Sequence, residues 1–222
     1  MSIWEIFAAL MLIGIVLQVR NVKKEQNKNK NDESSHFSEV ILITCGDYRV
    51  AAFVRKYIKR MHQWWEMDIL TTAGGARTIT MSVRDISMGN FLFSLAEYIG
   101  FLFKKIALWI DFAAYYSHDA EKVVIANHKF CAKCPKFESD EAEDGFHIKT
   151  LIRAREIVKK KYPKIREIIL LYVIIDKETH EASKVIEISP TGEIKTIIIS
   201  EEEKLAFKEN ELKMLKNKEQ ES

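Results

Sequence analysis

The residues of this sequence best suited to metal chemistry are three cysteines and one histidine. Cys45 begins the run Cys-Gly-Asp-Tyr-Arg, and His128 precedes Cys131 and Cys134 in His-Lys-Phe-Cys-Ala-Lys-Cys. Thiolates and imidazoles are preferred ligands of Zn²⁺, which they usually hold in tetrahedral geometry. Three protein ligands leave a fourth position for water, whereas four close the site. The residue types therefore predict a zinc site, either open and catalytic or closed and structural.

The cysteines also suggest a second chemistry. A Cys-x-x-Cys pair such as Cys131 and Cys134 can lower the pKa of a thiol and support thiol exchange. That interpretation gives no role to Cys45 or His128. An odd count of three cysteines in 222 residues excludes a disulfide scaffold.

The chemistry-bearing residues follow apolar runs that predict buried strands. Cys45 follows the run at 39–44, and His128 follows the run at 122–127. Further strands are expected at 67–72, 167–175, 184–188 and 193–199, the last two forming a hairpin. Helices are expected at 50–61, 90–116 and 146–162. The alternation predicts a three-layer α/β/α fold, with a mainly parallel sheet and an antiparallel C-terminal hairpin. Parallel strands would bring Cys45 and His128 to one edge of the sheet.

Three short motifs, in this order, resemble those of the β-class carbonic anhydrases. Residues 45–49 resemble the family's C-x-D-x-R signature, and residues 128–131 resemble its H-x-x-C signature. Between them, Ala73, Gly74 and Gly75 resemble the family's Ala-Gly-Gly/Asn loop, which follows the second strand. The resemblance extends over about residues 40–175.

This resemblance implies a function and a role for each matched residue. Cys45, His128 and Cys131 would hold Zn²⁺, and a zinc-bound hydroxide would hydrate CO2 reversibly to bicarbonate. Asp47 would orient that hydroxide, and Arg49 would hold Asp47. In the family's closed state the aspartate becomes the fourth ligand, so both states remain open here.

The resemblance also implies a substrate loop at Ala73, Gly74 and Gly75, and a homodimer with residues 90–116 as a candidate interface. Two other functions remain. Cys134 could be a fourth ligand, which would make a non-catalytic zinc domain. Alternatively, the same metal site could hydrolyse a CO2-like substrate such as COS or CS2.

The N-terminal segment predicts a membrane anchor. Residues 3–19 are almost entirely apolar, and several basic residues follow directly. The positive-inside rule then places the rest of the chain in the cytoplasm, as a single-pass protein. We expect an anchor at 1–20, a polar flexible linker at 21–36, the zinc domain at 37–199, and a C-terminal helix with a charged tail at 200–222. The alternative for the apolar run is a buried core helix.

Composition limits the other function classes. With 34 basic and 32 acidic residues the net charge is +2, so we expect no nucleic-acid partner. A hydrophobic content of 47% excludes wholesale disorder. Among the remaining histidines, which we expect to be surface or packing residues, His118 and His147 are candidate proton shuttles.

Overall fold

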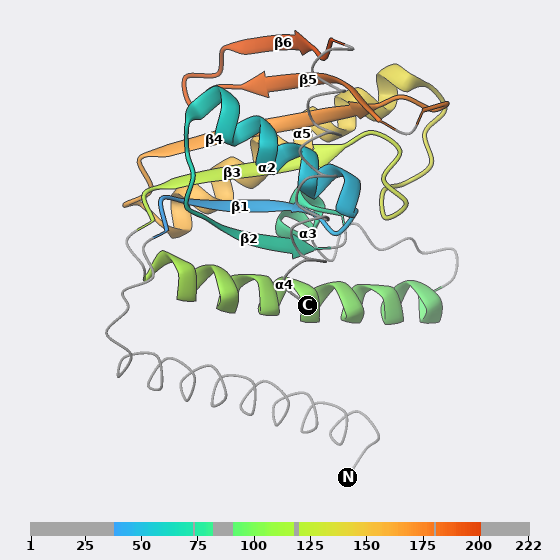
Figure 1. Cartoon of the computed structure of the whole chain (residues 1–222). Helices are drawn as coiled ribbons and strands as arrows, with labels where there is room; N and C mark the ends of the chain where they lie inside the picture. Colours follow the sequence, from blue (N-terminus) through green and yellow to red (C-terminus); the bar gives the residue numbers. More distant parts are fainter. Residues whose placement is uncertain (1–37, 73, 82–90, 118–119, 180, 201–222) are drawn as a thin grey trace, which may run out of the picture.

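A six-stranded sheet organises the described part of the chain (Figure 1). The computed structural model describes residues 38–72, 74–81, 91–117, 120–179 and 181–200, and the side chains of 91–98 are not described. The strand order is β2-β1-β3-β4-β5-β6. The strands are β1 (Val40–Cys45), β2 (Met67–Thr72), β3 (Lys122–His128), β4 (Glu167–Ile175), β5 (Ala182–Ile188) and β6 (Ile194–Ile198).

The sheet is mixed, with its parallel part at the site. Strands β2, β1, β3 and β4 pair in parallel, while β5 and β6 add antiparallel strands. Every residue of β1 is buried, as are all residues of β3 except its first. Such strands have both faces covered, which explains their nearly continuous apolar sequences. The predicted mainly parallel sheet and its antiparallel C-terminal hairpin are both confirmed.

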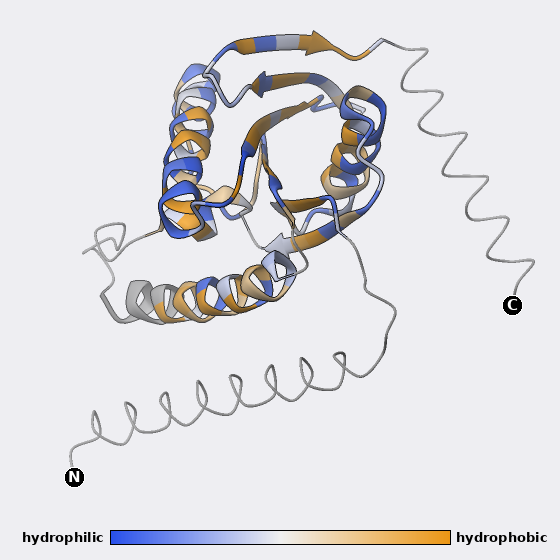
Figure 2. Ribbon diagram, turned by 90° about the vertical axis from the view of Figure 1, so that its left-hand side faces the viewer, coloured by the Kyte–Doolittle hydropathy of each residue, from blue (hydrophilic) through white to orange (hydrophobic). Residues whose placement is uncertain are grey.

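Helices cover both faces of the sheet. Helix α2 (Tyr48–His62) packs on one face through an apolar cluster that includes Val54 and Leu42. Helices α3 (Ala76–Thr80), α4 (Phe91–Tyr116) and α5 (Asp140–Lys161) contribute to the cluster on the other face. Helix α4 also lies along β2, and hydrophobic colours extend over much of its described length (Figures 1 and 2). The predicted α/β/α layering is confirmed.

Two helices differ from the sequence-based expectation. Helix α5 begins at Asp140 rather than at residue 146, so that prediction was wrong at its start. Ser139 caps the helix by accepting a hydrogen bond from the Ala142 amide at 3.2 Å. Acidic residues in the first turn add favourable interactions with the helix dipole. Helix α3 was not predicted, since its five residues are too few to show an apolar period.

The predicted helix at 90–116 is one continuous helix, α4. Within the described part of the chain, no helix has the length and apolarity needed to cross a membrane. The predicted anchor at 1–20, the linker at 21–36 and the tail from residue 201 lie outside the described residues.

Candidate metal centre

The three residues expected to hold a metal converge at the carboxyl ends of β1 and β3. Cys45 is the last residue of β1, His128 is the last residue of β3, and Cys131 lies in the turn that follows. Because these strands are parallel neighbours, their carboxyl ends meet. One ligand atom from each of the three residues lies within 4.8 Å of the others. The predicted convergence of Cys45 with His128 is therefore confirmed.

His128 is oriented for coordination through Nε2. Its Nδ1 lies 2.8 Å from the Lys129 carbonyl oxygen, which can only accept a hydrogen bond. The hydrogen of the neutral ring is therefore on Nδ1, and Nε2 carries the free lone pair. Nε2 is buried and has no partner that satisfies hydrogen-bond geometry among the described residues. A buried, unsatisfied ring nitrogen is a suitable ligand for a metal ion.

The separation of the two sulfurs fits Zn²⁺. The Sγ atoms of Cys45 and Cys131 lie 3.8 Å apart. Two Zn–S bonds of about 2.3 Å at the tetrahedral angle place their sulfurs roughly 3.8 Å apart. Cys45, His128 and Cys131 are all buried, which limits competition from water. The donor set, its spacing and its burial thus fit a zinc ion.

Both candidate thiol ligands have raised pKa values. The hydrogen bond between Cys45 and Cys131, together with burial, raises the pKa of the Cys45 thiol to about 12. The hydrogen bond between Cys131 and Cys134, together with burial, raises the pKa of the Cys131 thiol to about 11. Because a metal ion binds the thiolate form of cysteine, metal binding at these two residues would release protons.

Asp47 and Arg49 form an ion pair beside this cluster. The Arg49 guanidinium donates from Nε to Oδ1 at 3.0 Å and from Nη2 to Oδ2 at 2.7 Å. Asp47 also caps α2 by accepting the Arg49 backbone N–H at 3.1 Å. The bidentate contact holds the pKa of Asp47 below its usual value. The carboxylate is thus ionised, and Arg49 holds both of its oxygens.

Asp47 and Cys134, the two alternative fourth ligands, lie outside the three-residue cluster. The Cys134 amide donates to the Cys131 carbonyl at 2.8 Å, which forms a tight turn. A hydrogen bond from the Cys131 thiol lowers the pKa of Cys134. The structure thus places Cys134 next to Cys131 but outside the group of three residues whose ligand atoms lie within 4.8 Å of one another.

The predicted glycine loop packs against the carboxyl ends of β1 and β3. Gly75 has φ +52°, and a Cβ there would lie 2.6 Å from the Ala126 carbonyl oxygen. The same Cβ would lie 2.7 Å from the Asn127 side-chain oxygen. The Thr72 carbonyl accepts hydrogen bonds from both Gly46 and Gly75, which joins this loop to the one that follows Cys45. Gly74 is described as well, whereas Ala73 lies outside the described residues.

Of the two candidate proton shuttles, His118 lies outside the described residues. His147 is fully buried and stacks on Tyr172, with 5.0 Å between ring centroids. Burial lowers the pKa of His147 to about 4. This position makes His147 a packing residue, because a shuttle must exchange protons with solvent.

Sequence reasoning did not identify several polar residues around the site. The side-chain oxygen of Asn127 accepts the Ala76 amide at 2.9 Å and so holds the start of α3. Lys129 and Glu143 are both buried charged residues. Lys129 is the first residue of the turn after β3 and pairs with Asp140 on α5, while Glu143 on α5 accepts the Phe130 amide of that turn. The sequence did contain a signal for the start of the helix that carries Glu143, because Ser139 and the acidic residues after it are typical of a helix N-terminus.

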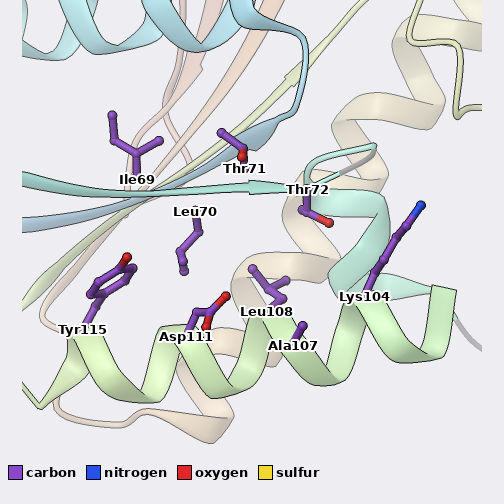
Figure 3. A pocket seen from close by; sticks show the side chains of 9 residues that line it. All are labelled: Ile69, Leu70, Thr71, Thr72, Lys104, Ala107, Leu108, Asp111 and Tyr115. Carbon is purple, nitrogen blue, oxygen red and sulfur yellow. The ribbon is translucent and has the colours of Figure 1, made fainter. Parts of the chain in front are cut away.

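A separate pocket of about 350 Å³ lies between β2 and α4. Thr71 and Thr72 line it from the strand, and Lys104, Asp111 and Tyr115 line it from the helix (Figure 3). It contains none of the predicted ligands and neither residue of the Asp47–Arg49 pair.

The fold and the site define an α/β protein with a Cys-His-Cys cluster at the carboxyl edge of a parallel sheet. The family model described as "Putative carbonic anhydrase" matches residues 35–183. This match covers most of the chain, so the chain belongs to this family.

Solved structures similar to the chain include the β-carbonic anhydrase CcaA, at 11% identity and a TM-score of 0.42, covering 86% of this chain and 92% of that one. A tetrameric β-carbonic anhydrase from the filamentous ascomycete Sordaria macrospora is also 11% identical, with a TM-score of 0.28. In that case 84% of this chain and 96% of the other are covered. No curated protein matches the sequence.

Proposed function

We propose that this protein is a zinc enzyme that hydrates CO2 reversibly to bicarbonate. The observation that carries the proposal is the convergence of Cys45, His128 and Cys131 within 4.8 Å. Membership of the carbonic anhydrase family supports it. The adjacent ion pair of Asp47 with Arg49 supplies an ionised carboxylate beside the cluster.

In this proposal Cys45, His128 and Cys131 would hold Zn²⁺. A bound Zn²⁺ would lower the pKa of water to about 7 and so supply a nucleophile near neutral pH. The Lys129 carbonyl keeps the hydrogen of His128 on Nδ1 and so leaves Nε2 for the metal. Asp47 remains ionised because Arg49 holds it, so its oxygens can accept a hydrogen bond and orient the nucleophile toward CO2.

Two alternative functions lead to different experimental outcomes. A non-catalytic zinc domain closed by Cys134 requires a fourth protein ligand, and the position of Cys134 outside the cluster supports an open site instead. A hydrolase of COS or CS2 would use the same ligands, so substrate competition must distinguish it from a carbonic anhydrase.

The full-length purified protein, loaded with zinc, tests the proposal by stopped-flow CO2 hydration near neutral and in mildly alkaline buffer. We expect one zinc per chain and hydration above the buffer rate, both lost in Cys45→Ser. Stoichiometric zinc without hydration under either condition would refute the proposed activity. Faster turnover of COS or CS2 than of CO2 would identify the alternative enzyme.

We also propose the domain organisation predicted from the sequence. Residues 1–20 anchor the chain in a membrane, 21–36 form a linker, 37–199 form a cytoplasmic zinc domain, and 200–222 form a C-terminal helix and tail. The apolar run and the basic residues after it support the anchor. Fractionation and protease accessibility of intact cells test this arrangement, and recovery of the full chain in the soluble fraction would contradict it.

We propose a homodimer, with support from the family resemblance and from the mostly apolar helix α4. Light scattering of the purified chain measures its mass in solution. A monomeric mass at micromolar concentration would refute the dimer.

A further inference from the structure

We propose that Glu143, assisted by Lys129, is a positioning residue for the metal ligands. The two residues hold the turn at residues 129–134, which we name the ligand turn, against helix α5. The ligand turn begins directly after His128 and contains Cys131. This inference rests on the proposed metal centre, and it adds Glu143, a residue outside the motifs of the sequence.

The first contact joins helix α5 to the backbone of the ligand turn. The Phe130 amide donates to Oε1 of Glu143 at 2.7 Å. Glu143 is only 7% exposed, so this bond is shielded from competing water. Phe130 lies between His128 and Cys131 in the chain, so the contact fixes the backbone that connects them.

The second contact is ionic and involves the neighbouring residue of the turn. Nζ of Lys129 lies 3.2 Å from a carboxylate oxygen of Asp140 and 3.2 Å from one of Asp144, both on α5. Lys129 is 6% exposed, and a charge this deeply buried requires such partners. Asp144 also accepts the Tyr172 hydroxyl at 2.7 Å, which connects the arrangement to β4.

The backbone of Phe130 is in a conformation that needs external support. Its φ is +60°, in the left-handed region that residues other than glycine seldom adopt. Such a residue persists when its surroundings hold it, and these positions concentrate at functional sites. The Glu143 hydrogen bond acts on this same residue, and it therefore supports the strained conformation.

The consequence for the metal site follows from the two ends of the turn. At one end the Lys129 carbonyl orients the His128 ring, and at the other Cys131 brings its sulfur to 3.8 Å from that of Cys45. Loosening the turn would disturb both ligands together. Residues that orient metal ligands typically change metal affinity by 10–100-fold when mutated.

The test compares Glu143→Ala with Glu143→Gln in the full-length protein. Co²⁺ titration followed by absorption measures metal affinity, and hydrogen exchange measures protection of the Phe130 amide in the metal-free protein. For Glu143→Ala we expect metal affinity to fall about 10–100-fold, together with faster exchange at Phe130. Glu143→Gln retains an oxygen acceptor, so we expect both properties to stay close to wild type.

Two control variants separate positioning from general destabilisation. Glu141→Ala removes an exposed carboxylate from the same helix and should leave both readouts unchanged. Leu151→Ala removes a fully buried side chain of α5 from the hydrophobic core and lowers thermal stability from a position outside the ligand turn. We expect this variant to keep wild-type metal affinity well below its melting temperature.

The outcomes also separate this inference from the proposed metal centre. Co²⁺ binding unaffected by Cys131→Ser would refute the metal centre itself. If Cys131→Ser abolishes binding while Glu143→Ala binds normally, only the positioning role is refuted. An equal loss of affinity in the Ala and Gln variants would refute the hydrogen-bond role, because charge alone would then explain the effect.

Discussion

Replacing Gly75 by alanine should destabilise the protein more than the same change at Gly192 or Gly145. A Cβ at Gly75 would meet the Ala126 carbonyl oxygen at 2.6 Å and Oδ1 of Asn127 at 2.7 Å. Real Cβ atoms essentially never come within 3.0 Å of such atoms, so the loop or strand β3 must move. Since β3 carries His128, the movement would also reach the candidate metal centre.

The expected loss of stability in Gly75→Ala combines a backbone cost with a packing cost. Gly75 has φ +52° and ψ −122°, a combination that residues other than glycine rarely adopt, so an alanine there costs about 1–3 kcal/mol. Forcing an extra methyl group into a packed site adds roughly 1–3 kcal/mol. The expected loss is therefore about 4 kcal/mol, a large part of the roughly 5–15 kcal/mol that stabilises a typical domain. For a domain of this size, the melting temperature should fall by roughly 10 °C.

Urea and thermal denaturation of the metal-free protein, followed by far-ultraviolet circular dichroism, measure this loss. Gly192 provides a matched control, because its φ is +89° but a Cβ there would meet nothing within 4 Å. Gly192→Ala should therefore show the backbone cost alone, about 1 kcal/mol. Gly145→Ala lies within helix α5 in open space and should stabilise it by up to about 1 kcal/mol. A Gly75→Ala protein no less stable than Gly192→Ala would refute the reasoning from close contact.

Three further predictions concern the site and its surroundings. Cys134→Ser should retain full zinc content and an unchanged Co²⁺ spectrum, because Cys134 lies outside the three-residue cluster. Loss of metal in this variant would show that Cys134 is a ligand. Asp47→Asn should keep its zinc but lower the CO2 hydration rate roughly 10²-fold in stopped-flow assays, because the carboxylate held by Arg49 is lost; an unchanged rate would contradict that role. Burial lowers the pKa of His147 from an ordinary 6.5 to about 4 in the folded protein. The neutral form of His147 therefore contributes fully to stability above pH 6.5. This contribution is lost as the pH falls toward 4, and the free energy of unfolding should decrease by about 3 kcal/mol. Denaturation across this range should show that loss in wild type and a smaller one in His147→Phe, whereas identical pH dependence would exclude His147 as its source.

Much of the fold could be predicted from local pattern. The buried strands β1, β3 and β4 have continuous apolar sequences because helices cover both of their faces. Helix α5 shows the limit of such reasoning. Its apolar period becomes clear only late in the helix, so its start was predicted at residue 146, while the Ser139 cap sets the true start at Asp140.

The ligand chemistry was also readable from the sequence, because residue type and spacing are properties of the chain itself. Cys45, His128 and Cys131 each follow or end an apolar run, and thiols with an imidazole indicate zinc. The motif around Cys45 also suggested the contact of Asp47 with Arg49. These residues are only two positions apart, with Asp47 at the N-cap of α2 and Arg49 in its first turn.

Other features depend on strand order and helix packing, which local sequence does not encode. Only the placement of β1 beside β3 brings two distant cysteines to a sulfur separation of 3.8 Å. The requirement for glycine at position 75 comes from the backbone of β3, about 50 residues away in sequence. The bond from Phe130 to Glu143 likewise exists because α5 packs against that strand. The sequence by itself therefore specifies the candidate ligands and the strands that carry them. The tertiary structure specifies their neighbours, because contacts between distant segments form only after the sheet has assembled.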